Sequence, residues 1–342
     1  MKNLSYQSLH CHTTTSDGVL SYSQVLDECK KNNIGVVAYT DHDALPTVSQ
    51  LSELKKTPHE VKWICGIEIS AKKVKEVESP IELFHITGLF VDPTNEALQN
   101  YCEHAYEKRK KRTIEMIEKL RHLGFEITYG DVEKLATGRS IGRPHIAQAL
   151  LNNKKNIDIL NKIETKLYRE AINNKSLNKL AKQVKKDSIW QKLFDLLLSN
   201  KSYVPGIYVH YLDGLDMDSA VNLIRDAGGV ALLAHWSYMK KDIPILLVEK
   251  LLKEKRIDGL ETVYAFGAED ENYNSFVVDM NDVTELCEKY ECIQGGGGDF
   301  HKVEDFTYMK NKKFESFAER TKGMTERILR LHPDLDKTWT TL

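Results

Sequence analysis

Long hydrophobic runs are missing from this 342-residue chain: no stretch of about 18 apolar residues could span a bilayer. The N-terminus also lacks the basic and then apolar pattern of a signal peptide, which favours a cytoplasmic address. The six cysteines form no C-x-x-C pair, so their spacing indicates neither a disulfide framework nor a zinc knuckle, and reduced thiols fit best. The hydrophobic content of 41% is ordinary for a globular protein with a sizeable core.

The net charge of -2 conceals a strong asymmetry along the chain. Residues 101–201 hold 22 Lys and Arg against 12 Asp and Glu, a balance of +10, so the remainder holds 26 against 38, a balance of -12. An acidic body with a basic segment is compatible with a polyanionic partner. A solvated, lysine-rich helical surface accounts for the charge equally well.

Outside the basic segment, short apolar runs recur as strand candidates with helical stretches between several of them. The candidates are LSYQSLH (4–10), GVVAYT (35–40), VKWICGIEIS (61–70), ELFHITGLFV (82–91), GVALLAH (229–235), DGLETVYA (258–265) and CIQGGGGDFH (292–301). Ser21 and Gln24 form a capping-box pattern that predicts a helix start. Alternating strands and helices predict an α/β architecture with a mostly parallel sheet, and seven strands can close into a barrel.

A long segment between the fourth and fifth predicted strands breaks this rhythm. Its first part, up to Gly124, has the apolar spacing of one long helix, and after SIGRPHIAQALL a Lys-, Asn- and Leu-rich helical sequence continues to about residue 200. We therefore predict a discontinuous barrel domain over 1–95 and 215–310, a basic helical insertion over 96–214, and one further helix with a tail over 311–342.

Residues with metal-ligating side chains fall at or just after the ends of the predicted strands, except for His85, which lies within the fourth. They are His10, His12, His42, Glu68, His85, His235, Asp299 and His301, with Asp17 in the turn after the first strand. In a parallel α/β barrel the carboxyl ends of the strands face one mouth, so these side chains should converge there.

The spacing within two pairs supports a shared site. Residues i and i+2 of an extended backbone point to the same side, so His10 and His12 can reach one ion while Cys11 faces away, and Asp299 and His301 can do the same. Imidazoles and carboxylates without thiolates suit Mn, Fe or Zn. Each motif alone also has a plain structural interpretation: a polar turn, a helix cap or a core histidine. The conjunction at six of seven strand ends favours the metal site, whereas Glu261 in the sixth strand fits a structural or supporting role better.

The order HxH, SDG, TDHD, GIEIS, a strand histidine, AH and DFH resembles that of the PHP (polymerase and histidinol phosphatase) superfamily of metal-dependent phosphoesterases. Within it, the chain is similar to the stand-alone bacterial 3′,5′-nucleoside bisphosphate phosphatases and 5′-to-3′ exoribonucleases. The likeness runs from about residue 5 to 305 and includes GRPH at 142–145. It implies a distorted seven-stranded (β/α) barrel.

The resemblance also implies a centre of two or three divalent ions and assigns its ligands. One ion would be held by His10, His12, Glu68 and Asp299. A second would share Glu68 as a bridge and add His85 and His235, and a third would take Asp17, His42 and His301. Trp236, Gly298 and Lys302 depart from the usual family residues at their positions, which leaves the choice of substrate open.

The expected chemistry is hydrolysis of a phosphate ester by a metal-bridging hydroxide held at the Glu68 and Asp299 site. Arg143 is the best candidate for a phosphate clamp, because a guanidinium binds phosphate oxygens in a bidentate way. His145 is a candidate to support it or to protonate the leaving group, although the GRPH motif could equally start a helix, with Pro144 as the first helical residue. Lys302 is a further substrate-binding candidate. The substrate would be a phosphorylated nucleotide or a nucleic-acid 5′ end, with no membrane partner.

Three other functions compete with this one. A histidinol-phosphate-type phosphomonoesterase of the same superfamily would need no basic insertion. A metal-dependent amidohydrolase also begins with HxH but usually bridges its metals with a carboxylated lysine, where Glu68 stands here. A non-catalytic, metal-stabilised nucleic-acid-binding protein is disfavoured by the complete ligand set.

Overall fold

The computed structural model of the chain describes residues 4–74, 83–136, 138–210, 214–240, 242–264, 273–310 and 315–342. It divides into two compact units, Met1–Ala105 with Gly214–Leu342, and Tyr106–Asp213. Each unit has a hydrophobic core of its own. The helix α3 (Glu96–His122) begins in the first unit and continues into the second, and Gly124 follows it with a positive φ of 92°.

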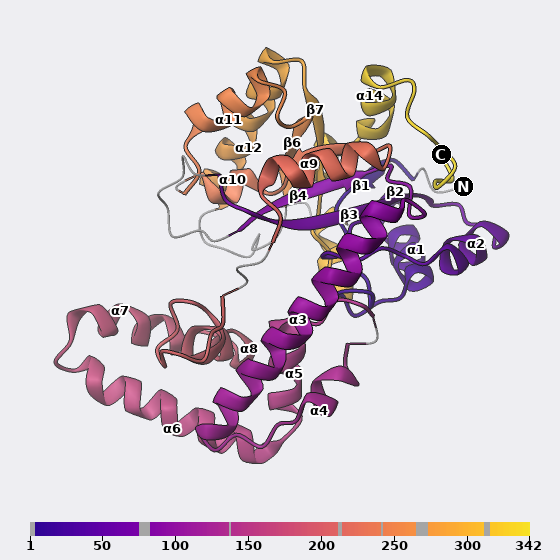
Figure 1. The fold of residues 1–342 in the computed structure, drawn as a ribbon. Helices are drawn as coiled ribbons and strands as arrows, with labels where there is room; N and C mark the ends of the chain where they lie inside the picture. The colour runs from indigo at the N-terminus through magenta and orange to yellow at the C-terminus, as the bar shows by residue number, and fades with distance from the viewer. Residues whose placement is uncertain are drawn as a thin grey trace. The chain divides into compact units, whose positions relative to one another are not determined.

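Seven strands in the first unit form one sheet in the order of the chain (Figure 1). They are β1 (Tyr6–Ser8), β2 (Ile34–Tyr39), β3 (Lys62–Lys72), β4 (Leu83–Leu89), β5 (Val230–Leu233), β6 (Gly259–Tyr264) and β7 (Ile293–Gly297). The two outer strands also meet, because Leu9 N donates to Gly296 O at 2.9 Å and Cys11 bridges Phe300 in parallel. The predicted α/β fold of a distorted seven-stranded barrel is confirmed.

The sheet is mostly parallel, as predicted, but one strand is reversed, which the sequence analysis did not predict. β4 runs antiparallel to both β3 and β5, while the other neighbouring pairs are parallel. Strand direction cannot be predicted from these apolar runs, because a buried strand carries the same side-chain pattern either way. The reversal has a functional consequence: the beginning of β4, not its end, lies at the mouth of the barrel.

Helices of the first unit pack around the sheet (Figure 1). They are α1 (Tyr22–Lys31), α2 (Val48–Lys56), α9 (Met217–Asp226), α10 (Trp236–Met239), α11 (Ile245–Lys253), α12 (Tyr273–Lys289), the 3₁₀ helix η2 (Val303–Lys310), α13 (Glu315–Arg320) and α14 (Met324–Leu331). The capping box of Ser21 and Gln24 is present at α1. The C-terminal segment holds two helices, not the single one predicted, and it belongs to the first unit.

The second unit is helical. After α3 it contains α4 (Tyr129–Glu133), α5 (Arg143–Leu151), α6 (Lys154–Ala171), α7 (Lys175–Val184), α8 (Ile189–Leu193) and the π-helical turn η1 (Phe194–Leu198). Leu120, Leu167 and Leu197 are fully buried in its core. Across the described residues of both units, no helix combines the length and the apolar character needed to cross a membrane.

Candidate metal centre

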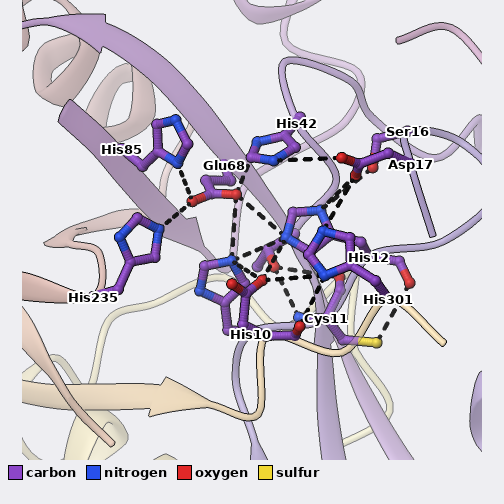
Figure 2. Close-up of polar contacts among 12 residues, drawn as sticks. His10, Cys11, His12, Ser16, Asp17, His42, Glu68, His85, His235 and His301 are labelled. Atoms are coloured by element: carbon purple, nitrogen blue, oxygen red, sulfur yellow. Dashed lines mark hydrogen bonds and ion pairs between the residues drawn. The ribbon is translucent and has the colours of Figure 1, made fainter. Parts of the chain in front are cut away.

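Glu68 lies at the centre of a cluster of imidazoles at the barrel mouth (Figure 2). Its Oε1 lies 2.9 Å from His85 Nδ1 and 3.0 Å from His235 Nε2. Its Oε2 lies 2.9 Å from His42 Nδ1, and 3.3 Å from Nε2 of both His10 and His12. A single buried carboxylate therefore faces two groups of nitrogen ligands, as a bridging ligand must.

Two further carboxylates complete the cluster. Asp299 Oδ1 lies 3.0 Å from His12 Nε2 and 3.3 Å from His10 Nε2. Asp17 Oδ1 lies 3.4 Å from His301 Nε2, and its Oδ2 lies 3.9 Å from His42 Nε2. The structure thus brings together all the predicted ligand residues, which all lie in the first unit.

Five buried ligand-type atoms in this cluster have ion-pair neighbours but make no hydrogen bond of suitable geometry among the described residues: Asp17 Oδ1, His42 Nδ1, Glu68 Oε2, His85 Nδ1 and Asp299 Oδ1. Buried polar atoms are nearly always satisfied, since leaving one unpaired costs about 1–3 kcal/mol. Their concentration at one place shows that the residues fit a group that accepts several oxygen and nitrogen ligands at once. Divalent cations have that property.

The ligand-type atoms fall into three overlapping groups whose members lie within 4.8 Å of one another. The groups are His12, Asp17, His42 and His301; His10, His12 and Glu68; and His42, Glu68 and His85. Two histidines thus sit between neighbouring groups. His12 adjoins the Asp17 group as well as the Glu68 group, and His42 approaches Glu68 more closely than it approaches Asp17.

Charge in the cluster is strongly coupled. Burial alone would raise the pKa of the Glu68 carboxyl. The positive charges of His42, His85 and His10 have the larger effect and hold this pKa well below its usual range. Burial lowers the pKa of His12, yet hydrogen bonds to Asp299 and Glu68 raise it to about 10. The metal-free cluster therefore stabilises itself with protons on imidazoles and negative charge on carboxylates, and cations can replace those protons.

Glu261, a fully buried carboxylate, holds one ligand in place. Its Oε1 accepts from His10 Nδ1 at 2.7 Å and from Thr87 Oγ1 at 2.6 Å, and its Oε2 accepts from the backbone N–H of His235 at 2.9 Å. This contact fixes the hydrogen on His10 Nδ1, so Nε2 presents its lone pair to the cluster. The carboxylate in the sixth strand was visible in the sequence, but its contact with His10 was not.

Asp41 is a supporting residue that the sequence reasoning missed. Its carboxylate accepts from the backbone N–H groups of Thr13 and Ser16 at 2.7 and 3.1 Å, and from both of their hydroxyls. These bonds shape the turn that carries Asp17. The TDHD motif could have indicated this role, because its first aspartate directly follows the predicted second strand, where a buried carboxylate needs hydrogen-bond donors.

The backbone at the mouth is unusual in two ways. His235 and Asp299 both adopt left-handed conformations, with φ of 36° and 49°, which non-glycine residues rarely do outside functional sites. Gly297 lets β7 approach the end of β1, since a Cβ there would lie only 2.9 Å from Leu9 N and closer still to Ser8 Oγ. Both features bring ligands into a small space.

Of the three predicted substrate-binding residues, Arg143 and His145 belong to the second unit, and Lys302 follows His301 in the first. Arg143 opens α5 in the second unit, where its guanidinium lies 5.5 Å from the Tyr208 ring and donates to Leu198 O at 3.3 Å. His145 is buried, and its Nδ1 accepts from Gly142 N at 3.1 Å, so it caps the helix; Pro144 is the second helical residue, not the first as predicted. The side chain of Lys302 is exposed.

A mixed α/β barrel whose strand ends gather imidazoles and carboxylates around a bridging glutamate defines the class of metal-dependent hydrolases. The PHP domain family model matches residues 8–224, more than half of the chain. The chain therefore belongs to the PHP domain family, and the predicted class, a metal-dependent phosphoesterase, is confirmed.

Curated relatives carry several activities within that class. The chain is 25% identical over 296 residues, 86% of its length and 94% of the relative's, to a phosphoribosyl 1,2-cyclic phosphate 1,2-diphosphodiesterase from Eggerthella lenta. It is 23% identical, with 86% of each chain covered, to a 3′,5′-nucleoside bisphosphate phosphatase from Chromobacterium violaceum. A 5′-3′ exoribonuclease from Haemophilus influenzae is 30% identical over 42% of this chain and 49% of that protein.

Solved structures support the fold. A Chromobacterium violaceum protein described as an amidohydrolase with bound sulfate superimposes with a TM-score of 0.62 at 21% identity, covering 87% of this chain and 88% of that one. A Bifidobacterium adolescentis protein assigned as a metal-dependent phosphoesterase gives a TM-score of 0.61 at 20% identity, covering 86% and 87%. At these identities the likeness establishes the fold alone.

Proposed function

We propose that this protein hydrolyses phosphate ester bonds of nucleotides or of nucleic-acid 5′ ends, with two or three divalent ions of Mn, Fe or Zn as cofactors. The observation that carries the proposal is the set of five buried ligand-type atoms around Glu68 that make no hydrogen bond of suitable geometry among the described residues. The substrate class is supported by relatives named for nucleoside bisphosphates and for RNA.

The ligand assignment is the one that the family resemblance implies, and the contacts of Glu68 with His10, His12, His85 and His235 support it. His10, His12, Glu68 and Asp299 would hold one ion; Glu68 with His85 and His235 a second; Asp17, His42 and His301 a third. Bound cations supply Lewis acidity, which makes water nucleophilic near neutral pH and neutralises charge on phosphate oxygens. The protein positions this chemistry through Glu261, which orients His10, and through Asp41, which orients the turn before Asp17.

Substrate recognition falls to cationic side chains. Arg143 can bind phosphate oxygens in a bidentate way, and its stacking near Tyr208 pre-orients the guanidinium. Lys302 follows the ligand His301 directly, which makes its ammonium a second candidate for phosphate. His145 is the weakest of the three, because one ring nitrogen already caps α5.

A second substrate class is favoured by one observation. The Eggerthella lenta relative aligns over 86% of this chain and is named for a cyclic phosphate of phosphoribose. Opening a five-membered cyclic phosphodiester and cleaving a terminal phosphate both require attack on phosphorus by water, so one centre could serve either. A histidinol-phosphate-type phosphomonoesterase remains the simplest alternative.

The test is phosphate and nucleotide release by the purified chain with Mn²⁺. The substrates are adenosine 3′,5′-bisphosphate, 5′-phosphorylated RNA and DNA oligonucleotides, phosphoribosyl 1,2-cyclic phosphate and histidinol phosphate. We expect turnover of the bisphosphate or of the oligonucleotides, abolished by EDTA and restored by Mn²⁺. His12→Ala should reduce it by at least about 100-fold, since a ligand that faces both Glu68 and Asp299 is lost.

The control is His59→Ala, which removes a histidine outside the cluster. It should retain full turnover. Equal activity of His12→Ala and the unaltered chain would refute the assigned site, and release from histidinol phosphate alone would refute the nucleotide assignment.

A further inference from the structure

The second unit carries a row of exposed lysines along α7. Lys175, Lys179 and Lys182 follow one another at helical spacings of four and three residues, and Lys186 continues the row just after the helix. These four residues, here the α7 lysine stripe, span about 16 Å at a rise of about 1.5 Å per residue. The opposite face of α7 contributes Ala181 and Val184 to the buried core.

The stripe is not balanced by acidic residues. No Asp or Glu occurs between Glu170 and Asp187, and none of the four lysines is ion-paired in the described part of the chain. Lysines elsewhere in the same unit do find partners: Lys155 pairs with Glu126 and Lys192 with Glu164, each at 2.8 Å. The four charges of the stripe therefore have no acidic partner among the described residues, neither in an ion pair nor within the segment between Glu170 and Asp187.

The arrangement is unfavourable for the helix itself. Like charges at i, i+3 and i, i+4 repel one another along a helix surface. Lys175 is also the first residue of α7, where the helix dipole disfavours a positive charge, and the first turn contains no acidic residue to offset it. The stripe therefore destabilises α7, and a bound anion would remove this repulsion.

We propose that the α7 lysine stripe binds the phosphodiester backbone of a nucleic-acid strand. A row of ammonium groups along one straight edge matches a polymer with a charge at every nucleotide, and α7 offers no aromatic side chain for base stacking. Binding is therefore independent of base sequence. The inference rests on the proposed function in taking a nucleic acid as the partner, but it concerns a surface separate from the metal ligands.

The test compares the full chain with a variant in which Lys175, Lys179, Lys182 and Lys186 are all changed to Gln. Glutamine keeps a helix propensity close to that of lysine, so α7 should fold and melt no lower than before. Binding of 3′-labelled, phosphorothioate-linked 12-mers of RNA and of DNA is measured by anisotropy with Mn²⁺ present, between about 50 and 200 mM salt.

In a plot of log Kd against log salt concentration, each phosphate contact with a single strand contributes about 0.7 to the slope. Removing four such contacts should therefore lower the slope by up to about 2.8. The matched control changes Lys30, Lys56, Lys289 and Lys322 to Gln, four lysines ion-paired in the first unit, with the same change in net charge. It should keep the slope of the unaltered chain.

The inference is refuted if the stripe variant loses less than about 0.7 of the slope, the value of one contact, or if the control variant loses as much slope as the stripe variant. It is also refuted if the stripe variant binds a polyglutamate peptide more weakly but binds the oligonucleotides as tightly as the unaltered chain does. Hydrolysis of adenosine 3′,5′-bisphosphate separates the two proposals. If the stripe variant hydrolyses it normally and its slope is unchanged, only the stripe is refuted; if nothing is hydrolysed but the slope falls as expected, only the proposed activity is.

Discussion

Among single residues, the proposed ligands depend on neighbouring side chains that are not themselves proposed as ligands. Glu261 is the clearest case, because one carboxylate receives His10 Nδ1, the Thr87 hydroxyl and the His235 backbone N–H. Partners of this kind fix the ring orientation and tautomer of a ligating histidine and raise its basicity. The positions of two proposed ligands from different strands are thus coupled through one side chain.

Replacing this carboxylate tests the coupling. Glu261→Gln keeps the shape of the side chain but replaces one carboxylate oxygen by an NH₂ group, which cannot accept a hydrogen bond. The substitution therefore removes the acceptor either of the His235 N–H or of the His10 and Thr87 donors. We expect Mn²⁺ affinity to fall by about 10- to 100-fold. Thr87→Val, which removes one hydroxyl donor and leaves the carboxylate, is the control and should lose much less. Equal Mn²⁺ affinity of Glu261→Gln and the unaltered chain would show that Glu261 does not position His10.

At the scale of the element, the seam between β1 and β7 brings Asp299 and His301 beside His10 and His12. Gly297 permits the close approach, and Ser8 Oγ accepts from Gly298 N at 3.1 Å across the seam. Gly297→Ala should therefore destabilise the chain by about 1–3 kcal/mol, measured by denaturant unfolding, because the added methyl meets backbone atoms that cannot move aside.

Gly130→Ala is the matched control for the seam. A Cβ at Gly130 would meet only Thr128 Oγ1, at 3.8 Å, and the position lies in α4, where alanine is the better helix former. We expect its stability to be unchanged or slightly higher. If the two variants unfold at the same denaturant concentration, the tight seam is not a determinant of the fold.

The positions of the strands and of most candidate ligands follow from the sequence, but the direction of one strand does not. The strands were predictable because each is a short apolar run, and most candidate ligands were predictable because they lie at or just after the ends of those runs. The direction of β4 was not, and His85 reaches the mouth only because β4 is antiparallel and begins there. Asp41 and Glu261 gave weak signals because their roles depend on partners far away in sequence.

For the molecule as a whole, the two proposed activities fall on units of different charge. The first unit holds the buried cluster, and the second holds Arg143 and the α7 lysine stripe. The asymmetry of +10 against -12 was visible in the sequence, but the stripe was not singled out, because charge counts ignore which side of a helix a lysine occupies. An anion bound to the stripe would relieve the repulsion between its lysines, and cations bound in the cluster would replace the protons on its histidines. The stability of the molecule therefore depends on what is bound at each place.

The sign of the pH dependence follows from the cluster. Imidazoles with a raised pKa, such as His12 at about 10, contribute stability that is fully present below about pH 6.5 and lost as the pH rises towards the folded value. Carboxylates with a lowered pKa, such as Glu68, contribute stability present above about pH 4.3 and lost as the pH falls below it. Without metal, this cluster is most stabilising between about pH 4 and 6.5, and at neutral pH cations must displace protons.

Calorimetric titration of the metal-free chain with Mn²⁺ at pH 7, in two buffers of different ionisation enthalpy, measures both the number of ions bound around Glu68 and the protons that they displace. We predict binding of more than one Mn²⁺ per chain with net proton release, seen as heats that differ between the buffers. Glu68→Gln, which removes the bridging carboxylate, should bind fewer ions and release fewer protons. The same number of ions and the same proton release in both proteins would contradict a metal centre built around Glu68.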